Sequence, residues 1–150
     1  MNHYNYTKDK ELAEQCEYEV ACAICEKYGC DFVRYNHDNK YDILFYTKKG
    51  TYLKVEVKQD FTCARTGNVG VEYECRGKAS GIQTSEADMY CFKIHESEDK
   101  ASLYLIPTKE LKNMIVNKLF KTIVVGGDAN SNSKNFLFDL KVFKQHCIEV

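Results

Sequence analysis

The chain has 150 residues, a length that favours one domain, residues 1–150, with a hydrophobic core of its own. Apolar residues make up 44% of it and charged residues 29%, which is ordinary for a soluble globular protein. The formal net charge of -1 excludes an overall basic field, so any contact with nucleic acid would have to come from a local patch.

The sequence also limits where the protein is expected to work. No apolar run approaches the length of a membrane span, and residues 1–6 lack the apolar core of a signal peptide. We therefore expect a cytoplasmic protein with no membrane contact, whose eight cysteines stay reduced. Cys22 and Cys25 form a C-x-x-C pair without a second such pair, which favours small buried side chains over a zinc or iron–sulfur site.

The first expected element is a helix over residues 8–28, which Thr7 or Asp9 can cap and Gly29 can end. Its apolar residues recur at helical spacing and form one stripe: Leu12, Cys16, Val20, Ala23 and Ile24. This stripe is the face expected to pack on the core.

One carboxylate, Glu19, falls inside that stripe, whereas Glu11, Glu14 and Glu17 are expected to point elsewhere. A carboxylate on the core-facing side of a helix needs a partner. Two interpretations stay open. Glu19 is either a glutamate at the edge of the core, with its charge reaching solvent, or an acidic group aimed at the hairpin that comes next.

A strand at residues 30–35 and a polar turn at 36–40 are expected after this helix, and then a hairpin with strands 41–46 and 51–58. Both hairpin strands are rich in Tyr, Ile, Leu, Phe, Thr and Val. Gly50 closes the turn at a position that requires a left-handed backbone.

The turn fixes a register. If Thr47 faces Thr51, Asp42 lies directly across from Glu56, and Lys58 points from the same face two residues further on. Two carboxylates and an ammonium group then converge at the open end of the hairpin. A slip of one residue would move one strand's side chains to the other face, so the convergence depends on the turn.

Facing carboxylates repel each other, and a divalent cation between them would remove the repulsion. Carboxylate oxygens are hard ligands of the kind that Mg²⁺ takes. Beside such an ion, Lys58 would hold a water or stabilise the charge that develops on a phosphate. The alternative is a surface hairpin with an ordinary stripe of Glu and Lys.

The rest of the chain predicts further strands and helices. Residues 61–70 are expected to form a loop over the site, and residues 76–81 a turn whose backbone and cations either approach a phosphate or are solvated. The other expected strands are 71–75, 89–94, 103–106, 122–125 and 136–140. The expected helices are a turn capped by Thr84 or Ser85, a helix capped by Thr108 that carries Leu111 to Leu119, and a short C-terminal helix. A loop is expected over 126–133, in which Asp128 either binds a cation or only turns the chain. This order predicts an α/β (α+β) fold with one central sheet and helices on its faces.

The acidic Glu19, Asp42 and the run Glu56-Val57-Lys58 form a pattern that resembles the PD-(D/E)xK nuclease superfamily, with Tyr41 where that motif has proline. The resemblance covers roughly residues 8–95, and the run 77–82 with Thr84 looks like phage-encoded members. It implies a restriction-endonuclease-like core with a central mixed sheet, and the spacings look most like small Holliday-junction resolvases.

The resemblance also implies roles for individual residues. Asp42, Glu56 and the Val57 carbonyl would ligate Mg²⁺ or Mn²⁺, and Lys58 would position the attacking water. Glu19 would bind a second ion or orient the ligands of the first. Gln59 would contact a phosphate or a water bound to the ion.

The sequence therefore predicts a metal-dependent DNA endonuclease, structure-selective like a Holliday-junction resolvase and suited by a homodimer to a branched substrate with two-fold symmetry. The expected contacts to the DNA backbone are Lys48, Lys49, Arg65, Arg76 and Lys78. Alternatives of the same chemistry are a restriction-like, repair, flap or single-strand nuclease. Alternatives of another class are a catalytically silent nucleic-acid-binding or inhibitor protein, and a plain interaction domain.

Overall fold

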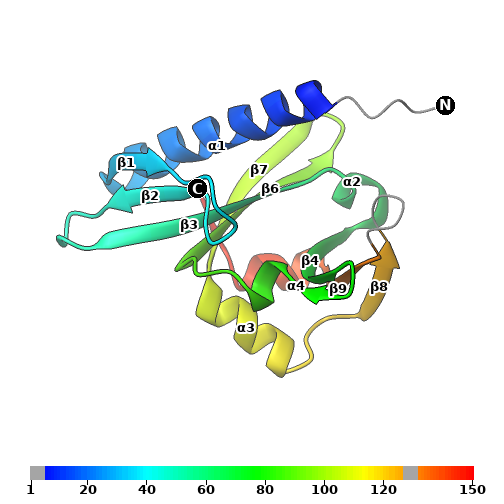
Figure 1. Cartoon of the computed structure of the whole chain (residues 1–150). Coiled ribbons are helices and arrows are strands. Elements are labelled where there is room, and N and C mark those ends of the chain that lie inside the picture. The colour runs from blue at the N-terminus through cyan, green and yellow to red at the C-terminus, as the bar shows by residue number, and fades with distance from the viewer. Residues whose placement is uncertain (1–5, 127–131) are drawn as a thin grey trace.

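The computed structural model describes residues 6–126 and 132–150, which form two β-sheets with helices packed against them (Figure 1). The elements in chain order are α1 (Tyr6–Tyr28), β1 (Asp31–Tyr35), β2 (Ile43–Tyr46), β3 (Tyr52–Asp60), α2 (Cys63–Thr66), β4 (Asn68–Cys75), β5 (Lys78–Ala79), the 3-10 helix η1 (Gly81–Gln83), β6 (Met89–Ser97), β7 (Lys100–Pro107), α3 (Thr108–Val116), β8 (Thr122–Gly126), β9 (Ser133–Asp139), α4 (Leu140–Gln145) and β10 (Ile148–Glu149). No helix in these described ranges is both long enough and apolar enough to cross a membrane.

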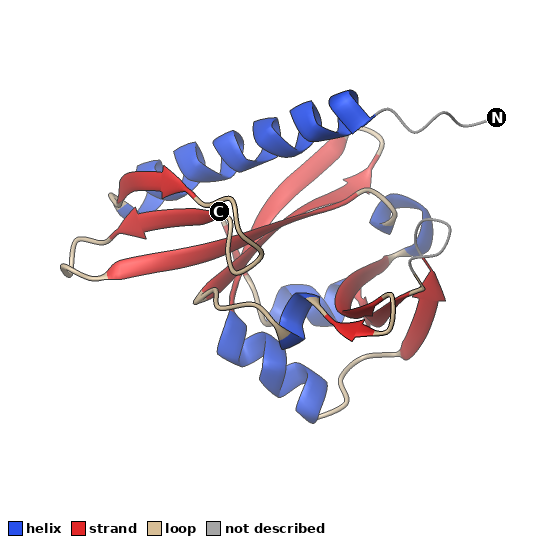
Figure 2. Ribbon diagram, viewed as in Figure 1, coloured by secondary structure: helices blue, strands red, loops and turns tan. Residues whose placement is uncertain are grey.

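The central sheet has six strands in the order β1-β2-β3-β6-β7-β10 (Figure 2). β3 and β6 run parallel, and the other neighbours are antiparallel, so the sheet is mixed. The fold class expected from the sequence, a central mixed sheet flanked by helices, is confirmed. No disulfide joins cysteines within the described ranges.

The expectation of a single sheet is wrong, because β5, β4, β9 and β8 form a separate four-stranded antiparallel sheet. The reason lies in the pairing of β3. β3 pairs directly with β6, so the chain between them is not inserted between these two strands, and β4 and β5 satisfy their backbone hydrogen bonds in the second sheet. β9, from much later in the chain, supplies the partner for β4.

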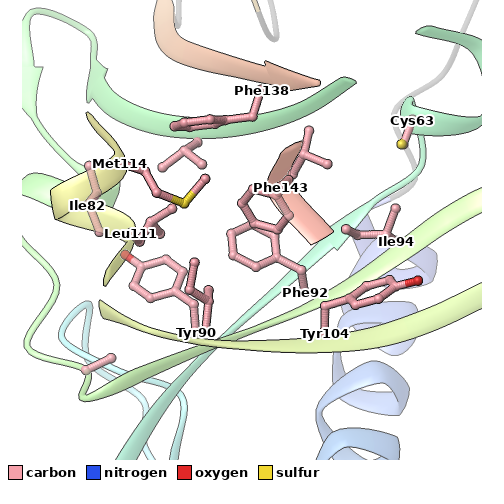
Figure 3. Close-up of a cluster of buried hydrophobic side chains, with 14 of the residues drawn as sticks. Cys63, Ile82, Tyr90, Phe92, Ile94, Tyr104, Leu111, Met114, Phe138 and Phe143 are labelled. Atoms are coloured by element: carbon pink, nitrogen blue, oxygen red, sulfur yellow. The ribbon is translucent and has the colours of Figure 1, made fainter. Parts of the chain in front are cut away.

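The two faces of the central sheet are covered differently. α1 lies along one face, and the small sheet with α3 and α4 lies on the other (Figure 1). Under α1 the core contains Val20, Ile24, Phe45 and Val55. The core on the other face is larger and aromatic, and Figure 3 shows part of it: Tyr90, Phe92, Tyr104, Phe138 and Phe143 with Leu111 and Met114.

Strand alternation explains how a polar site can border this aromatic core. Along β3, Val55 packs under α1, so Glu56 and Lys58 point to the opposite face. On the neighbouring strand β6, that same face carries Tyr90 and Phe92. The face of the sheet that holds the carboxylates is therefore polar on one strand and packed on the next.

Residues 61–70 are not the irregular loop that the sequence predicts, since they contain α2 and the beginning of β4. The Asp60 carboxylate sets this turn. Its Oδ1 accepts hydrogen bonds from the backbone N–H groups of Thr62 at 3.0 Å and Cys63 at 2.9 Å. Gly67 then ends α2 in a left-handed conformation, with φ of 72°.

Three local expectations differ from the structure. The helical turn near Thr84 is η1, and Thr84 is its C-cap instead of its N-cap. Thr108 lies in the first turn of α3, where Pro107 is the N-cap, and among the described residues its buried hydroxyl has no hydrogen-bond partner. α3 ends at Val116, before Leu119. The predicted loop over 126–133, with Asp128, lies mostly outside the described residues.

Candidate active site

The hairpin register is the one that its turn predicts. Ile43 pairs with Val55 and Phe45 with Leu53, so Asp42 stands opposite Glu56. The Thr47 N–H donates to the Thr51 carbonyl at 2.8 Å. Gly50 has a φ of +79°, as its turn position requires.

Asp42 lies just before β2 begins and is fixed by its own backbone. Its N–H donates to the Val55 carbonyl at 3.0 Å, and its carbonyl accepts from the Asn36 N–H at 2.8 Å. Its side chain then reaches β3, where Oδ2 accepts from the Val57 N–H at 2.7 Å. A carboxylate thus takes the place of the neighbouring strand at this point of β3.

This hydrogen bond also orients the Val57 carbonyl. In an extended strand, the N–H and C=O groups of one residue point to the same side. Because the Val57 N–H points at Asp42, its carbonyl oxygen faces the same gap beyond the end of β2. The gap is therefore bordered by three oxygen-bearing groups: the Asp42 carboxylate, the Glu56 carboxylate and the Val57 carbonyl.

Glu56 and Lys58 complete the group. The Lys58 ammonium lies 3.5 Å from Glu56 Oε1, and the side chains of Glu56 and Lys58 are 15% and 41% exposed. A cavity of about 400 Å³ opens over them. Its described lining residues are Asp38, Asn39, Asp42, Glu56, Lys58, Glu72, Ala79, Ser80, Gly81, Thr84 and Ser85, among which the carboxylates outnumber the one cation.

The carboxylates are held where negative charge is costly. Burial, followed by the charge of Asp42, raises the pKa of Glu56 to about 7, against the opposing effect of Lys58. Burial also raises the pKa of Asp42, although the Val57 N–H and Lys58 favour its charged form. A cation in the gap would relieve this repulsion.

The sequence predicts that Glu17 points away from the hairpin, yet Glu17 is a helix carboxylate whose pKa responds to the charges of Asp42 and Glu56. Burial, and then the negative charges of Asp42, Glu14 and Glu56, raise the pKa of Glu17 to about 7. Glu19 is held in a different contact, since its Oε2 accepts from the Lys93 ammonium at 2.7 Å.

The rotation of α1 explains this difference. The buried residues of the helix are Cys16, Val20, Ala21 and Ile24, whereas Leu12 is 40% exposed. The core-facing stripe is therefore turned toward the row that contains Glu17 and Ala21, four residues apart. Ala21 was the signal in the sequence, because a small apolar residue one turn after Glu17 extends the stripe to that side.

The oxygen donors at the gap fit a divalent cation. Mg²⁺ in proteins typically binds one or two carboxylates and keeps several waters. Asp42, Glu56 and the Val57 carbonyl supply such a set from one strand and the residue facing it. In residues 6–126 and 132–150, no three His, Cys, Asp or Glu side chains converge as a metal-binding group, so water would complete the coordination.

The opposite wall of the cavity comes from the small sheet, which the sequence did not connect with the site. Glu72 on β4 accepts a hydrogen bond from the Ser80 hydroxyl at 3.1 Å. Gly81 packs so closely that a Cβ there would lie 2.1 Å from the Glu72 carbonyl oxygen. This close approach brings the segment after β5 against β4 and closes the cavity.

The residues expected to contact DNA are spread over the molecule. Lys48 and Lys49 lie at the hairpin turn, the far end from Asp42, beside a separate hollow. Arg76 and Lys78 are exposed at the turn between β4 and β5 and do not line the cavity. Gln59 Nε2 lies 3.0 Å from His95 Nε2. Arg65 is exposed on α2 and, with Gln59, lines a hollow further along β3.

Comparison with known proteins finds similar solved structures. One is Hjc, a Holliday junction resolvase from the archaeal hyperthermophile Archaeoglobus fulgidus, with 14% identity over 91% of this chain and 90% of that one and a TM-score of 0.49. Another is the bacterial homing endonuclease I-Ssp6803I, with 22% identity over 70% and 71% of the two chains and a TM-score of 0.45.

One neighbour is a resolvase and the other an endonuclease, and at identities under 25% these likenesses concern the fold alone. No family model matches the chain, and no curated protein sequence matches it. Both TM-scores lie below 0.5.

The raised pKa of Glu56 makes a prediction about stability. Folding favours the protonated form, so the wild type loses stability as the pH rises from 4.5, the ordinary pKa, to about 7. Glu56→Gln carries no charge at any pH. In chelator at pH 8, we expect its melting temperature to lie a few degrees above that of the wild type, with the gain vanishing near pH 4.5.

Glu96 provides a matched contrast of opposite sign. Burial alone would raise its pKa, but hydrogen bonds from Lys144 and Tyr104 lower it to about 2. Glu96→Gln should therefore melt below the wild type at pH 8. Thermal unfolding of the three proteins at both pH values is the measurement, and a Glu56→Gln variant no more stable than wild type at pH 8 would contradict the account.

Proposed function

We propose that the protein is a metal-dependent DNA endonuclease that hydrolyses phosphodiester bonds. The observation that carries this proposal is the group of Asp42, Glu56 and Lys58 at one cavity, with Asp42 fixed by the Val57 N–H. Two partly buried carboxylates and one ammonium are the groups that metal-assisted phosphoryl chemistry uses.

Asp42, Glu56 and the Val57 carbonyl would hold one Mg²⁺ or Mn²⁺ ion. When bound, such an ion polarises a phosphoryl oxygen and lowers the pKa of its water. The resemblance implied that Glu19 binds a second ion or orients the ligands of the first. We assign this role to Glu17, because the charges of Asp42 and Glu56 raise its pKa. From that position Glu17 would orient a water or a second ion.

Lys58 is the residue expected to act on the reacting groups directly. Its ammonium lies beside Glu56 and lines the cavity. From there it would orient the attacking water or stabilise the negative charge that develops on the phosphoryl oxygens. Because Asp38 and Glu72 add further negative charge to the cavity, a DNA phosphate would enter only together with the cation.

The substrate we propose is DNA recognised by its structure, in the manner of a Holliday-junction resolvase. Contacts to a phosphate backbone carry no sequence information, so they select shape. Lys48, Lys49, Gln59, Arg65, Arg76 and Lys78 remain the proposed contacts, of which Gln59 and Arg65 are nearest the cavity along β3. A homodimer in the cytoplasm, acting on branched DNA with two-fold symmetry, belongs to the same proposal.

The test of this proposal is cleavage of plasmid, linear duplex, four-way junction and flap DNA, with Mg²⁺ or Mn²⁺ and with chelator. Metal-dependent cutting supports a nuclease. Binding that survives chelator without any cutting would instead favour a catalytically silent nucleic-acid-binding protein. Neither binding nor cutting would favour an interaction domain.

Lys58→Ala should lower the cleavage rate about a hundredfold to a thousandfold, because one preorganised charge at the phosphoryl group is lost. Asp42→Asn should abolish cutting, because a ligand of the ion is lost. Lys54→Ala is the matched control, since Lys54 lies on the same strand and face but packs over Tyr41, with its ammonium 5.4 Å from the ring centroid. Equal losses in Lys58→Ala and Lys54→Ala would argue against the assignment.

The assignment of Glu17 makes a separate prediction. Glu17→Gln should raise the metal concentration needed for half-maximal cleavage about 10- to 100-fold, because it loosens the surroundings of the ion. Glu19→Gln should leave that concentration unchanged and lower only the melting temperature, since it removes the partner of Lys93. Titration of both variants with Mn²⁺ is the measurement, and the reverse pattern would restore Glu19 to the site.

A further inference from the structure

The cavity over Glu56 and Lys58 continues as a groove along the second half of β3. A hollow of about 200 Å³ adjoins it and shares Lys58, Glu72 and Gly81 with it. A third hollow of about 570 Å³ adjoins the second and shares residues of β3 and β9 with it. We call these three hollows the groove. Its lining residues come from β3 on one side, from β4 and β9 on the other, and from α2 at its far end.

Phe61 lines the end of the groove, directly after β3, with its side chain 56% exposed. Its ring stacks on the imidazole of His95, with centroids 4.5 Å apart and planes 21° from parallel. His95 is held in turn by Gln59, whose Nε2 lies 3.0 Å from His95 Nε2. One face of the Phe61 ring is therefore covered and its orientation is set.

The exposed part of the Phe61 ring is an aromatic surface in the same hollow as the Arg65 guanidinium. Arg65 lines the same hollow, and within residues 6–126 and 132–150 no carboxylate pairs with its guanidinium. An aromatic ring beside an unpaired cation is the arrangement that binds single-stranded nucleic acid, in which bases stack on the ring and phosphates meet the charge.

The distance along the strand suits one DNA strand. Phe61 comes three residues after Lys58, which is about 10 Å along an extended chain. Lys58 and Phe61 also line successive hollows of the groove, so a strand with its scissile phosphate at Lys58 would have a nearby base at Phe61. The hollow that Phe61 lines, about 570 Å³, has the volume of a small-molecule site.

We propose that Phe61 is a stacking platform for an unpaired base, so that the substrate is DNA with unpaired nucleotides next to the scissile phosphate. The inference rests on the proposed nuclease function. A base inside a duplex is already stacked on both faces and is not available to the ring, whereas a base in a flap, gap or opened branch point is.

Binding in chelator tests the platform without any cutting. The full chain is titrated with a flap oligonucleotide that carries 2-aminopurine in its unpaired arm, and with the same base placed within a duplex. We expect quenching of 2-aminopurine fluorescence in the flap only. Phe61→Ala and Phe61→Leu should lose the quenching and weaken flap binding about tenfold, and Phe61→Trp should keep both.

Phe32→Ala is the matched control. Phe32 is 44% exposed and stacks against another ring, Tyr35, but it lies on β1 at the opposite edge of the hairpin from the groove. It should bind and quench like the wild type. The platform is overturned if Phe61→Leu, with a wild-type melting temperature, also binds and quenches like the wild type, or if Phe32→Ala weakens binding as much as Phe61→Ala does.

Cleavage with Mn²⁺ separates this inference from the function on which it rests. The ratio of flap cutting to duplex cutting should fall about tenfold in Phe61→Ala. An unchanged ratio overturns the platform and leaves the nuclease proposal standing. A wild-type protein that cuts none of the DNAs contradicts the nuclease proposal, and the binding experiment then supports or overturns the platform by itself.

Discussion

The hydrogen bond from the Val57 N–H to the Asp42 carboxylate is the contact on which the site depends. β2 begins one residue after Asp42, so β3 would otherwise leave an unpaired N–H group at this position. By accepting that hydrogen bond, the Asp42 carboxylate is held beside the gap. The same contact turns the Val57 carbonyl toward that gap, so a single structural need of the sheet arranges two of the proposed ligands.

The second constraint is charge. Burial raises the pKa values of Asp42, Glu56 and Glu17. Lys58 is the one cation among the described residues that line the cavity over Asp42 and Glu56. A protein gains no stability from such an arrangement by itself. The proposed cation would neutralise the charge of these carboxylates. Glu72 and Gly81 of the small sheet and its following segment form the opposite wall, so that the open edge of the central sheet becomes one side of a groove.

How far the sequence could predict this site depends on how local each feature is. The pairing of Asp42 with Glu56 depends on a short turn closed by Gly50, so it could be read from a few residues. The choice between Glu17 and Glu19 depends on how α1 is rotated on the sheet. Both flank the buried row, and only packing against Phe45 and Val55 decides which one faces the site.

The second sheet was beyond local patterns altogether. Its strands alternate well enough to be predicted as strands, but their partners lie far apart in the chain, as β4 and β9 do. Period-2 alternation gives no information on which strands pair. Glu72 and the groove could not be predicted from the sequence for the same reason, because both depend on β4 lying opposite β3.

The most direct test of the central claim is a crystal structure of the protein soaked in Mn²⁺, with data collected for anomalous scattering. The account predicts an anomalous peak in the gap beyond the end of β2, about 2 Å from oxygens of Asp42 and Glu56 and from the Val57 carbonyl. An empty gap at saturating Mn²⁺, or a peak bound elsewhere with Asp42 and Glu56 untouched, would contradict it.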